Sequence, residues 1–196
     1  MTDSDESWNR LLETARLELV PLQPHHADEL VAVLDDVRLY HFTGGEAAGL
    51  EELRQRYERW SRRVSPDGTE RWLNWVILRK EVARALGTVQ ATVVTDDGRL
   101  IADVGWVVGV AHQGQGYASE SAEVLIAWLF DCGVGEIVAH IHPAHAASGR
   151  LRRRSAWSRP SSGYSGNVAG SARGAPCRMD LRGGSSRQLS PNSCHR

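Results

Sequence analysis

The stretch from residue 100 to residue 132 constrains the fold most, because an apolar run passes through two glycines straight into a helical pattern. Residues 100–110 (LIADVGWVVGV) are rich in valine, as strands are, and residues 117–132 carry apolar side chains at helical spacing. A strand that turns through Gly-x-Gly into a helix leaves unpaired N–H groups at the positive end of the helix dipole. We therefore expect an anion site at residues 114–118, with phosphate as the most natural ligand.

Two well-known phosphate-binding motifs do not fit this stretch. A P-loop needs a lysine after its second glycine, and no lysine stands here. A dinucleotide fingerprint needs Gly-x-Gly-x-x-Gly between parallel strands, whereas the preceding runs are typical of antiparallel ones. On these residues alone, a simple glycine turn that caps a helix stays open as the alternative.

The other patterns predict a mixed α/β fold around one sheet. The turn TDDG at residues 95–98 separates two β-rich runs and suits an antiparallel meander. Pro24 is at a favourable first position for a helix. The expected strands are residues 15–22, 71–79, 85–94, 100–110 and 136–142, and the expected helices are residues 23–36, 49–63 and 117–132.

Composition narrows the class of protein. The 196 residues are 41% hydrophobic, which is enough for one well-formed core. A net charge of −1 gives no global attraction to nucleic acid or to an anionic membrane. The three cysteines lack the spacing of a zinc site or a disulfide framework, so no metal is expected. Without an apolar leader or a run long enough to span a membrane, the expected location is the cytoplasm.

The wider string VGWVVGVAHQGQGYASESAEVLIAWLFD resembles the acetyl-CoA-binding segment of the GCN5-related N-acetyltransferases (GNAT), and TARLELVPLQPHHADEL resembles the start of their RimJ/RimL-type branch. The resemblance implies a mostly antiparallel sheet with flanking helices in a domain at residues 14–149, after a flexible segment at 1–13. It also implies acetyl-CoA as co-substrate and a primary amine as acceptor, either a protein N-terminus or a small molecule. The matching motif comprises Gln113, Gly114, Gln115, Gly116, Tyr117 and Ala118.

The resemblance also implies roles for single residues. The N–H groups at residues 114–118 would hold the pyrophosphate, Val108 and Val110 would pair with the pantetheine arm, and the Val108 amide would donate to the oxyanion. His142 would contact the substrate, although a structural histidine is the alternative. In residues 143–148 the family has an Asn and a Ser that touch the cofactor. Ser148 matches, while His145 stands in place of the Asn.

Beyond Ser148 the resemblance stops. Residues 150–196 are rich in Arg, Ser and Gly and lack the periodicity of packed elements, which predicts a disordered tail. A shifted reading frame is the preferred explanation, because reading residues 155–158 one base later can restore an Arg-Leu-Gly-Leu segment. An evolved basic tail is the alternative. The chain is then an N-acetyltransferase, a defective relative that only binds acyl-CoA, or a binding protein that uses its tail, with homodimerisation left open.

Overall fold

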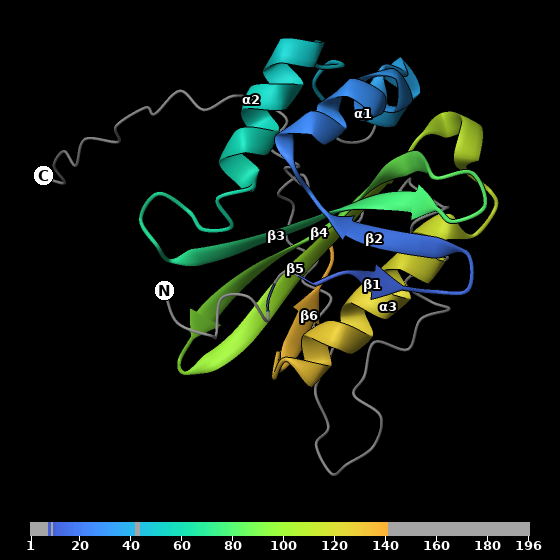
Figure 1. The fold of residues 1–196 in the computed structure, drawn as a ribbon. Coiled ribbons are helices and arrows are strands. Elements are labelled where there is room, and N and C mark those ends of the chain that lie inside the picture. The colour runs from blue at the N-terminus through green and yellow to red at the C-terminus, as the bar shows by residue number, and fades with distance from the viewer. Residues whose placement is uncertain (1–7, 9, 42–43, 141–196) are drawn as a thin grey trace, which may run out of the picture.

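A single six-stranded sheet organises the computed structural model, which describes residues 8, 10–41 and 44–140 (Figure 1). The strands lie in chain order, β1 to β6. They are β1 (Leu12–Glu13), β2 (Leu17–Pro21), β3 (Glu70–Arg79), β4 (Arg84–Asp96), β5 (Arg99–Val108) and β6 (Glu136–Val138). The helices are α1 (Ala27–Leu34), α2 (Leu50–Trp60) and α3 (Tyr117–Asp131), with short 3-10 helices η2 (Pro24–His26), η3 (Val37–Tyr40) and η4 (Val110–His112).

Strands β3, β4 and β5 form the predicted antiparallel meander. The β4–β5 hairpin pairs continuously from Gly87 with Val108 to Asp96 with Arg99. Its turn has positive φ at Asp97 (49°) and Gly98 (76°), as a two-residue loop with Asp-Gly requires. The expected mixed and mostly antiparallel sheet with flanking helices is therefore confirmed.

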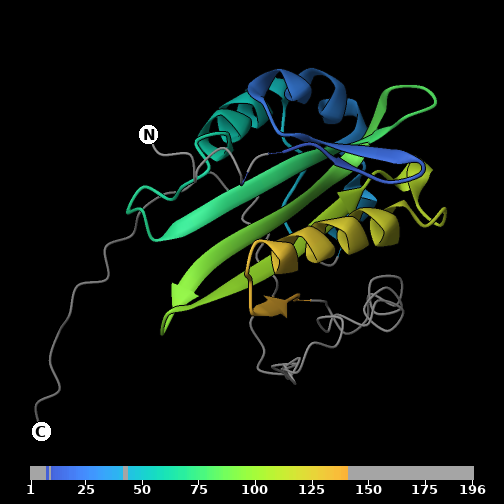
Figure 2. The same cartoon turned by 60° about the horizontal axis from the view of Figure 1, so that its bottom comes forward.

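Helix α3 covers one face of the sheet (Figure 2). Alternate residues of the strands point at it, because side chains in a strand alternate between the two faces. Trp75 of β3 meets Trp128 of α3 edge to face, with ring centroids 5.3 Å apart. Leu125 and Leu129 of α3 are fully buried in the same cluster.

Helices α1 and α2 cover the opposite face, where a second apolar cluster includes Leu30 of α1 and Leu53 of α2. The start of β4 is tied to this layer by a hydrogen bond from the Ala85 N–H to Glu29 Oε1 (2.7 Å). The helical layer is therefore held over the sheet by packing and by this side-chain acceptor.

Strand β6 pairs with β5 in parallel, over only three residue pairs that end at Asp103 with Val138. The rest of β5, from Val104 to Val108, has no partner on that side among the described strands. This unpaired edge lies next to the loop that leads into α3.

Several element boundaries differ from the sequence-based expectation. The strand predicted to reach residue 110 ends at Val108, because Val110 begins the 3-10 helix η4. The strand predicted at 136–142 is described as Glu136–Val138, and residues 141 and 142 lie outside the described part. The short strand β1 and helix η3 were not predicted. No described helix is long and apolar enough to cross a membrane, and no group of three or more metal-ligating side chains occurs in residues 10–41 and 44–140.

Candidate active site

The loop between β5 and α3 exposes a run of backbone N–H groups. Gly114 and Gly116 both have positive φ, 77° and 84°, and Gly116 is the N-cap of α3. The first helical hydrogen bond runs from the Glu120 N–H to the Gly116 carbonyl (3.0 Å). Within the described part of the chain, no group accepts from the N–H groups of Gly114 to Ser119. The loop therefore has the donors and the helix start that the predicted anion cradle needs, while binding of an anion there stays a prediction.

The end of β5 presents its backbone to the same region. The Val107 carbonyl points at Gly87 of β4, because a Cβ on that glycine would lie 1.9 Å from it. The carbonyl of the next residue, Val108, accepts from Gln113 Nε2 (3.0 Å) instead. Since successive residues of a strand direct their polar groups to opposite sides, the Val108 N–H also faces away from β4. The Val108 N–H therefore points to the side of β5 on which β6 pairs only with residues 101–103.

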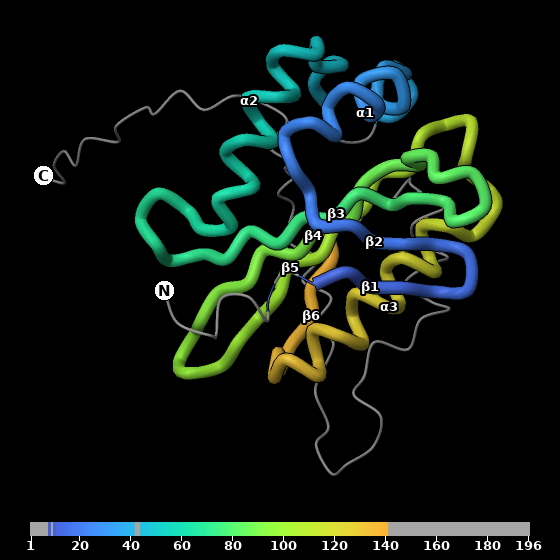
Figure 3. Tube along the Cα trace, viewed as in Figure 1, coloured from blue at the N-terminus to red at the C-terminus, as the bar shows by residue number. Residues whose placement is uncertain are grey.

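Arg16, in the turn between β1 and β2, clamps this loop from the other edge of the sheet. Figure 3 shows the β1–β2 hairpin beside α3, and the two are in contact. Arg16 Nη1 and Nη2 each donate to the Gln115 carbonyl (3.2 Å), and Nε and Nη2 donate to Glu120 Oε2 (2.8 and 2.6 Å). The guanidinium also lies 4.7 Å from the ring centre of Tyr117. The sequence carries no signal for this clamp, because its members are about 100 residues apart.

Glu120 is the centre of the clamp. Its Oε1 accepts from Thr14 Oγ1 (2.5 Å) and from the Arg16 N–H (3.2 Å). Burial acts to raise the pKa of Glu120, but the hydrogen bonds from Thr14 and Arg16 outweigh it and hold the pKa below its ordinary value. The carboxylate therefore stays charged and keeps the loop in place at neutral pH.

We expect Arg16→Ala to weaken acetyl-CoA binding about tenfold while changing kcat little, because the loop loses the donors that hold the Gln115 carbonyl. Arg16→Lys should recover only part of the loss, since ammonium lacks the planar fork. Lys80→Ala is the matched control: Lys80 forms an ion pair with Glu13 (3.0 Å) but does not touch the loop. A fall in kcat with unchanged affinity would contradict this positioning role.

The clamp also predicts a pH dependence of stability. The folded-state pKa of Glu120 is lowered, so its contribution to the free energy of unfolding is complete above the ordinary carboxyl pKa of 4.5. The contribution is lost as the pH falls through the lowered pKa. Denaturant unfolding of the wild type and of Glu120→Gln should therefore differ by a constant amount at neutral pH and converge in acid. A difference that does not vary with pH would count against the clamp.

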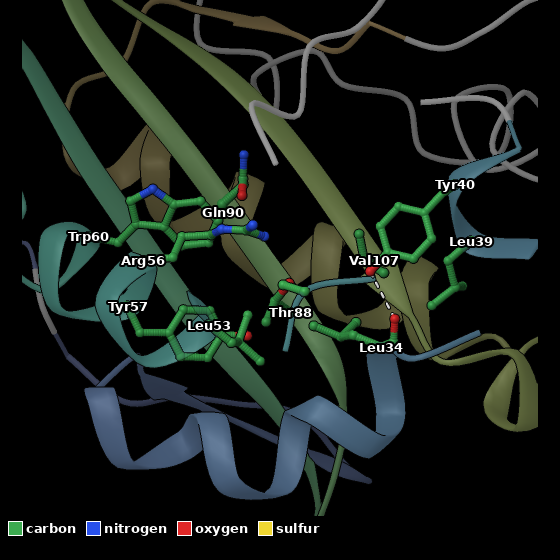
Figure 4. A pocket seen from close by; sticks show the side chains of 11 residues that line it. Leu34, Leu39, Tyr40, Leu53, Arg56, Tyr57, Trp60, Thr88, Gln90 and Val107 are labelled. Carbon is green, nitrogen blue, oxygen red and sulfur yellow. Dashed lines mark hydrogen bonds between the residues drawn. The ribbon is translucent and has the colours of Figure 1, made fainter. Parts of the chain in front are cut away.

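A pocket opens on the other face of the sheet, under α1 and α2 (Figure 4). It encloses about 550 Å³, counting the space open to solvent. Val107 of β5 lines it beside Thr88 of β4, its pairing partner. Since Val107 immediately precedes Val108, the pocket reaches the end of β5.

The polar lining of the pocket comes mainly from α2 and β4. Arg56 and Tyr57 are almost fully buried, at 3% and 1% exposed. Burial raises the pKa of Tyr57 and of Tyr40, so both phenols are protonated at neutral pH and can act as hydrogen-bond donors. None of the described residues that line the pocket is acidic or a histidine.

The structure brings together most of the predicted cofactor-binding residues. Val108 and the exposed segment from Gln113 to Gly116 lie side by side, followed by Tyr117 and Ala118 in the first turn of α3. Val110 was predicted to lie on the strand, but it lies in η4. His142, His145 and Ser148 lie outside the described residues.

His140, which shares the predicted strand face with His142, is exposed beside Asp103. Its Nε2 lies 3.4 Å from Asp103 Oδ2. Burial raises the pKa of Asp103, and His140 partly opposes the shift. This pair is at the paired end of β5, away from Val108.

Comparison with known proteins first identifies the fold as that of acetyltransferases. A GNAT-family acetyltransferase from Bacillus anthracis superposes with a TM-score of 0.60 at 16% identity, covering 74% of this chain and 81% of that one. The ribosomal-protein-S5-alanine acetyltransferase of Vibrio fischeri superposes with a TM-score of 0.60 at 16% identity, and the match covers 74% of this chain and 81% of that one. The ribosomal L7/L12 α-N-protein acetyltransferase RimL, in complex with coenzyme A, superposes with a TM-score of 0.62 at 16% identity, and the match covers 74% of this chain and 82% of that one.

The family follows from the sequence match. The model of the acetyltransferase (GNAT) domain matches residues 16–156, which is more than half of the chain. The chain therefore belongs to the GNAT family of acyl-CoA-dependent N-acetyltransferases. No curated protein sequence matches it.

Proposed function

We propose that this protein transfers the acetyl group of acetyl-CoA to a primary amine, using the β5–α3 loop to hold the cofactor. The observation that carries the proposal is the run of N–H groups from Gly114 to Ser119, which has no acceptor among the described residues. The run follows Gln113, whose side chain donates to the Val108 carbonyl. Family membership supplies the reaction class, and the relative RimL was crystallised with coenzyme A.

The cradle and the end of β5 would bind different parts of acetyl-CoA. The N–H groups of residues 114–118, at the N-terminus of α3, suit the charge of a pyrophosphate. Val108 and its neighbours on the unpaired edge of β5 suit the amides of the pantetheine arm. The Val108 N–H would donate to the thioester carbonyl and stabilise the negative charge that develops on it.

The transfer forms one C–N bond and breaks one C–S bond. The amine nitrogen attacks the thioester carbon, the amine loses one proton, and the departing thiolate takes one up. Neither buried tyrosine of the pocket can act as the base, because burial keeps both protonated. A water molecule in the pocket fits the role of base, and His142 and Ser148 remain candidates for contact with the substrate and cofactor.

The amine would enter through the pocket under α1 and α2, since Val107 joins that pocket to Val108. A protein N-terminus and a small amine are the two acceptor types we propose. Acetylation of the N-terminus of a ribosomal protein is described for the RimL relative.

Two measurements test the proposal. Calorimetric titration should show one acetyl-CoA site per chain, and thiol release from acetyl-CoA should depend on an added amine from a panel of peptides and small amines. Binding without amine-dependent release would favour the alternative of a defective relative that retains the cradle. Absence of binding would contradict the assignment of the cradle itself.

A further inference from the structure

We propose that the pocket binds an acceptor amine that also carries a neutral amide group, and that the Tyr57 hydroxyl donates to this amide. The inference rests on the proposed function, and it adds a specificity-determining residue and the chemical class of the acceptor. It is carried by three polar groups that line the pocket and have no hydrogen-bond partner in the described part of the chain: the hydroxyls of Tyr57 and Thr88 and the amide of Gln90.

The Tyr57 hydroxyl is the most deeply buried of these groups. The residue is 1% exposed, and within the described structure its hydroxyl has no hydrogen-bond partner. In Figure 4 its ring extends from α2 towards Thr88 of β4. A buried hydroxyl without a partner destabilises the fold, and such groups are rare in native proteins. Because Tyr57 lines the pocket, a molecule bound there can supply the missing partner.

The other tyrosine of the pocket shows the ordinary arrangement. The Tyr40 hydroxyl donates to the carbonyl of Leu34, the last residue of α1 (2.8 Å, Figure 4). This bond stabilises the end of α1 and uses the proton of Tyr40 within the fold. The two tyrosines therefore differ, since only the proton of Tyr57 is left for a bound molecule.

Thr88 and Gln90 give the pocket a polar floor on β4. They point to the same face of the sheet, because they are two residues apart in a strand. Thr88 pairs with Val107, the residue before Val108, so its hydroxyl is at the reacting end of the pocket. Gln90 pairs with Gly105, which has no side chain to cover the amide from β5.

The charges of the pocket favour a neutral group on the acceptor. None of the described lining residues is acidic, so a second cation on the acceptor would be buried without a counter-charge. Arg56 also lines the pocket, but its guanidinium is already engaged, since Nη2 donates to Glu52 Oε1 (2.8 Å). The groups that remain are two hydroxyls and one amide, each of which can donate and accept. A neutral amide, which also donates and accepts, is complementary to them.

An amino amide would use all three groups. The Thr88 hydroxyl would accept from the amine N–H, next to Val108. Because burial raises the pKa of Tyr57, the phenol keeps its proton and would donate to the amide carbonyl. Gln90 Oε1 would accept from the amide N–H. Two strand residues span about 7 Å, so the amide should lie a few bonds from the amine, as in an amino-carboxamide or the first peptide bond of a protein.

The test compares amines of equal shape that differ in the polar group: glycinamide with isobutylamine, and β-alaninamide with isopentylamine. β-Alanine is the anionic counterpart of the second pair. We would measure kcat/KM at saturating acetyl-CoA, corrected for the fraction of unprotonated amine, and, by NMR, binding of each amine to the coenzyme A-loaded protein. The amide of at least one pair should be preferred about tenfold over the hydrocarbon, the value of one or two neutral hydrogen bonds.

A longer acceptor separates the two sources of the amide. Lengthening glycinamide to the peptide amide Gly-Ala-Ala should raise kcat/KM if the natural acceptor is a protein N-terminus. It should lower kcat/KM if the natural acceptor is a small amino amide.

Two matched variants assign the preference, since each removes one hydroxyl from the same pocket. Tyr57→Phe should raise KM for the amide about threefold to tenfold, with kcat and the KM for the hydrocarbon amine unchanged. Its Tm should stay equal or rise, because a buried hydroxyl without a partner is removed. Tyr40→Phe should instead lower Tm, because the Leu34 carbonyl loses its donor, and leave the preference unchanged. Gln90→Met keeps the length of the side chain without the amide and should also reduce the preference.

The outcomes separate this inference from the proposed function. Equal kcat/KM and equal binding for the amide and the hydrocarbon in both pairs would overturn the inference alone. The same holds for a preference for β-alanine over β-alaninamide, or for a preference that Tyr57→Phe leaves unchanged while lowering Tm as Tyr40→Phe does. If Tyr57→Phe does not fold, an unchanged preference in Gln90→Met overturns the inference and a reduced one supports it. Failure to bind acetyl-CoA would instead overturn the proposed function.

Discussion

Replacing Gly114 with valine is expected to weaken acetyl-CoA binding by about a hundredfold or more. No atom lies within 4 Å of the place where a Cβ at this position would stand, so the valine side chain would occupy space that is open beside the loop, and we expect it to hinder the approach of a phosphate. Loss of one or two charge-assisted hydrogen bonds to phosphate costs about 3 kcal/mol, which corresponds to a factor of about one hundred. Calorimetric titration measures the change directly.

A good control for this variant must carry the same backbone strain. Gly98, in the β4–β5 turn, has a φ of 76° against 77° at Gly114, and it too has nothing within 4 Å. Valine in this left-handed region costs about 1–3 kcal/mol at either position. Gly98→Val should therefore lower stability to a similar extent and leave acetyl-CoA affinity unchanged. Equal affinities in the two variants would refute the cradle.

Replacing Gly87 with alanine is expected to have the largest effect on stability. The added Cβ would lie 1.9 Å from the Val107 carbonyl oxygen and 2.9 Å from the Val108 Cα, both of which are backbone atoms. The hairpin must therefore shift, and we expect a loss of about 3 kcal/mol in the free energy of unfolding, or about 10 °C in Tm. Because the shift displaces the Val108 N–H, kcat should fall as well.

The control for this second variant is Gly105→Ala on the neighbouring strand. Its Cβ would meet only the Gln90 side chain, at 3.6 Å, which is an ordinary contact. We expect its Tm to stay within a few degrees of the wild type in a thermal scan. If Gly87→Ala is as stable as Gly105→Ala, then the close approach of β4 and β5 does not shape the end of β5.

The sequence pattern predicted those strands and helices whose residues alternate regularly between buried and exposed positions. The alternation of β3 to β5 and the apolar spacing of α3 follow from burial of one side of each element, so these elements were predicted to within a few residues. The end of β5 was misplaced by two residues, because Val107, Val108 and Val110 have the same strand propensity. The chain leaves the strand at Gly109, where an added Cβ would lie 2.7 Å from Val33, and neighbours of this kind are not visible in a local pattern.

The candidate site was predicted only where it is continuous in sequence. The segment from Gln113 to Ala118 is continuous, so its glycines and its helix start were enough to predict the shape of the loop, while its binding of the cofactor stays a prediction. Arg16 and Arg56 could not be found in this way, because each acts on groups brought near by the sheet. Arg56 in particular has the sequence context of a solvated helix face, with Glu52 four residues away, and only its packing against the sheet separates it from Arg54.

The clamp between the β1–β2 turn and α3 also determines when a competent site can exist. Arg16 and Glu120 are 104 residues apart, and the strands between them must assemble before the two can meet. Contacts of such long sequence separation form late and slowly, because closure of the intervening loop costs entropy. We therefore expect the clamp to form only once the sheet is in place, so a chain that has only part of its sheet would contain the glycine loop without the clamp that holds it.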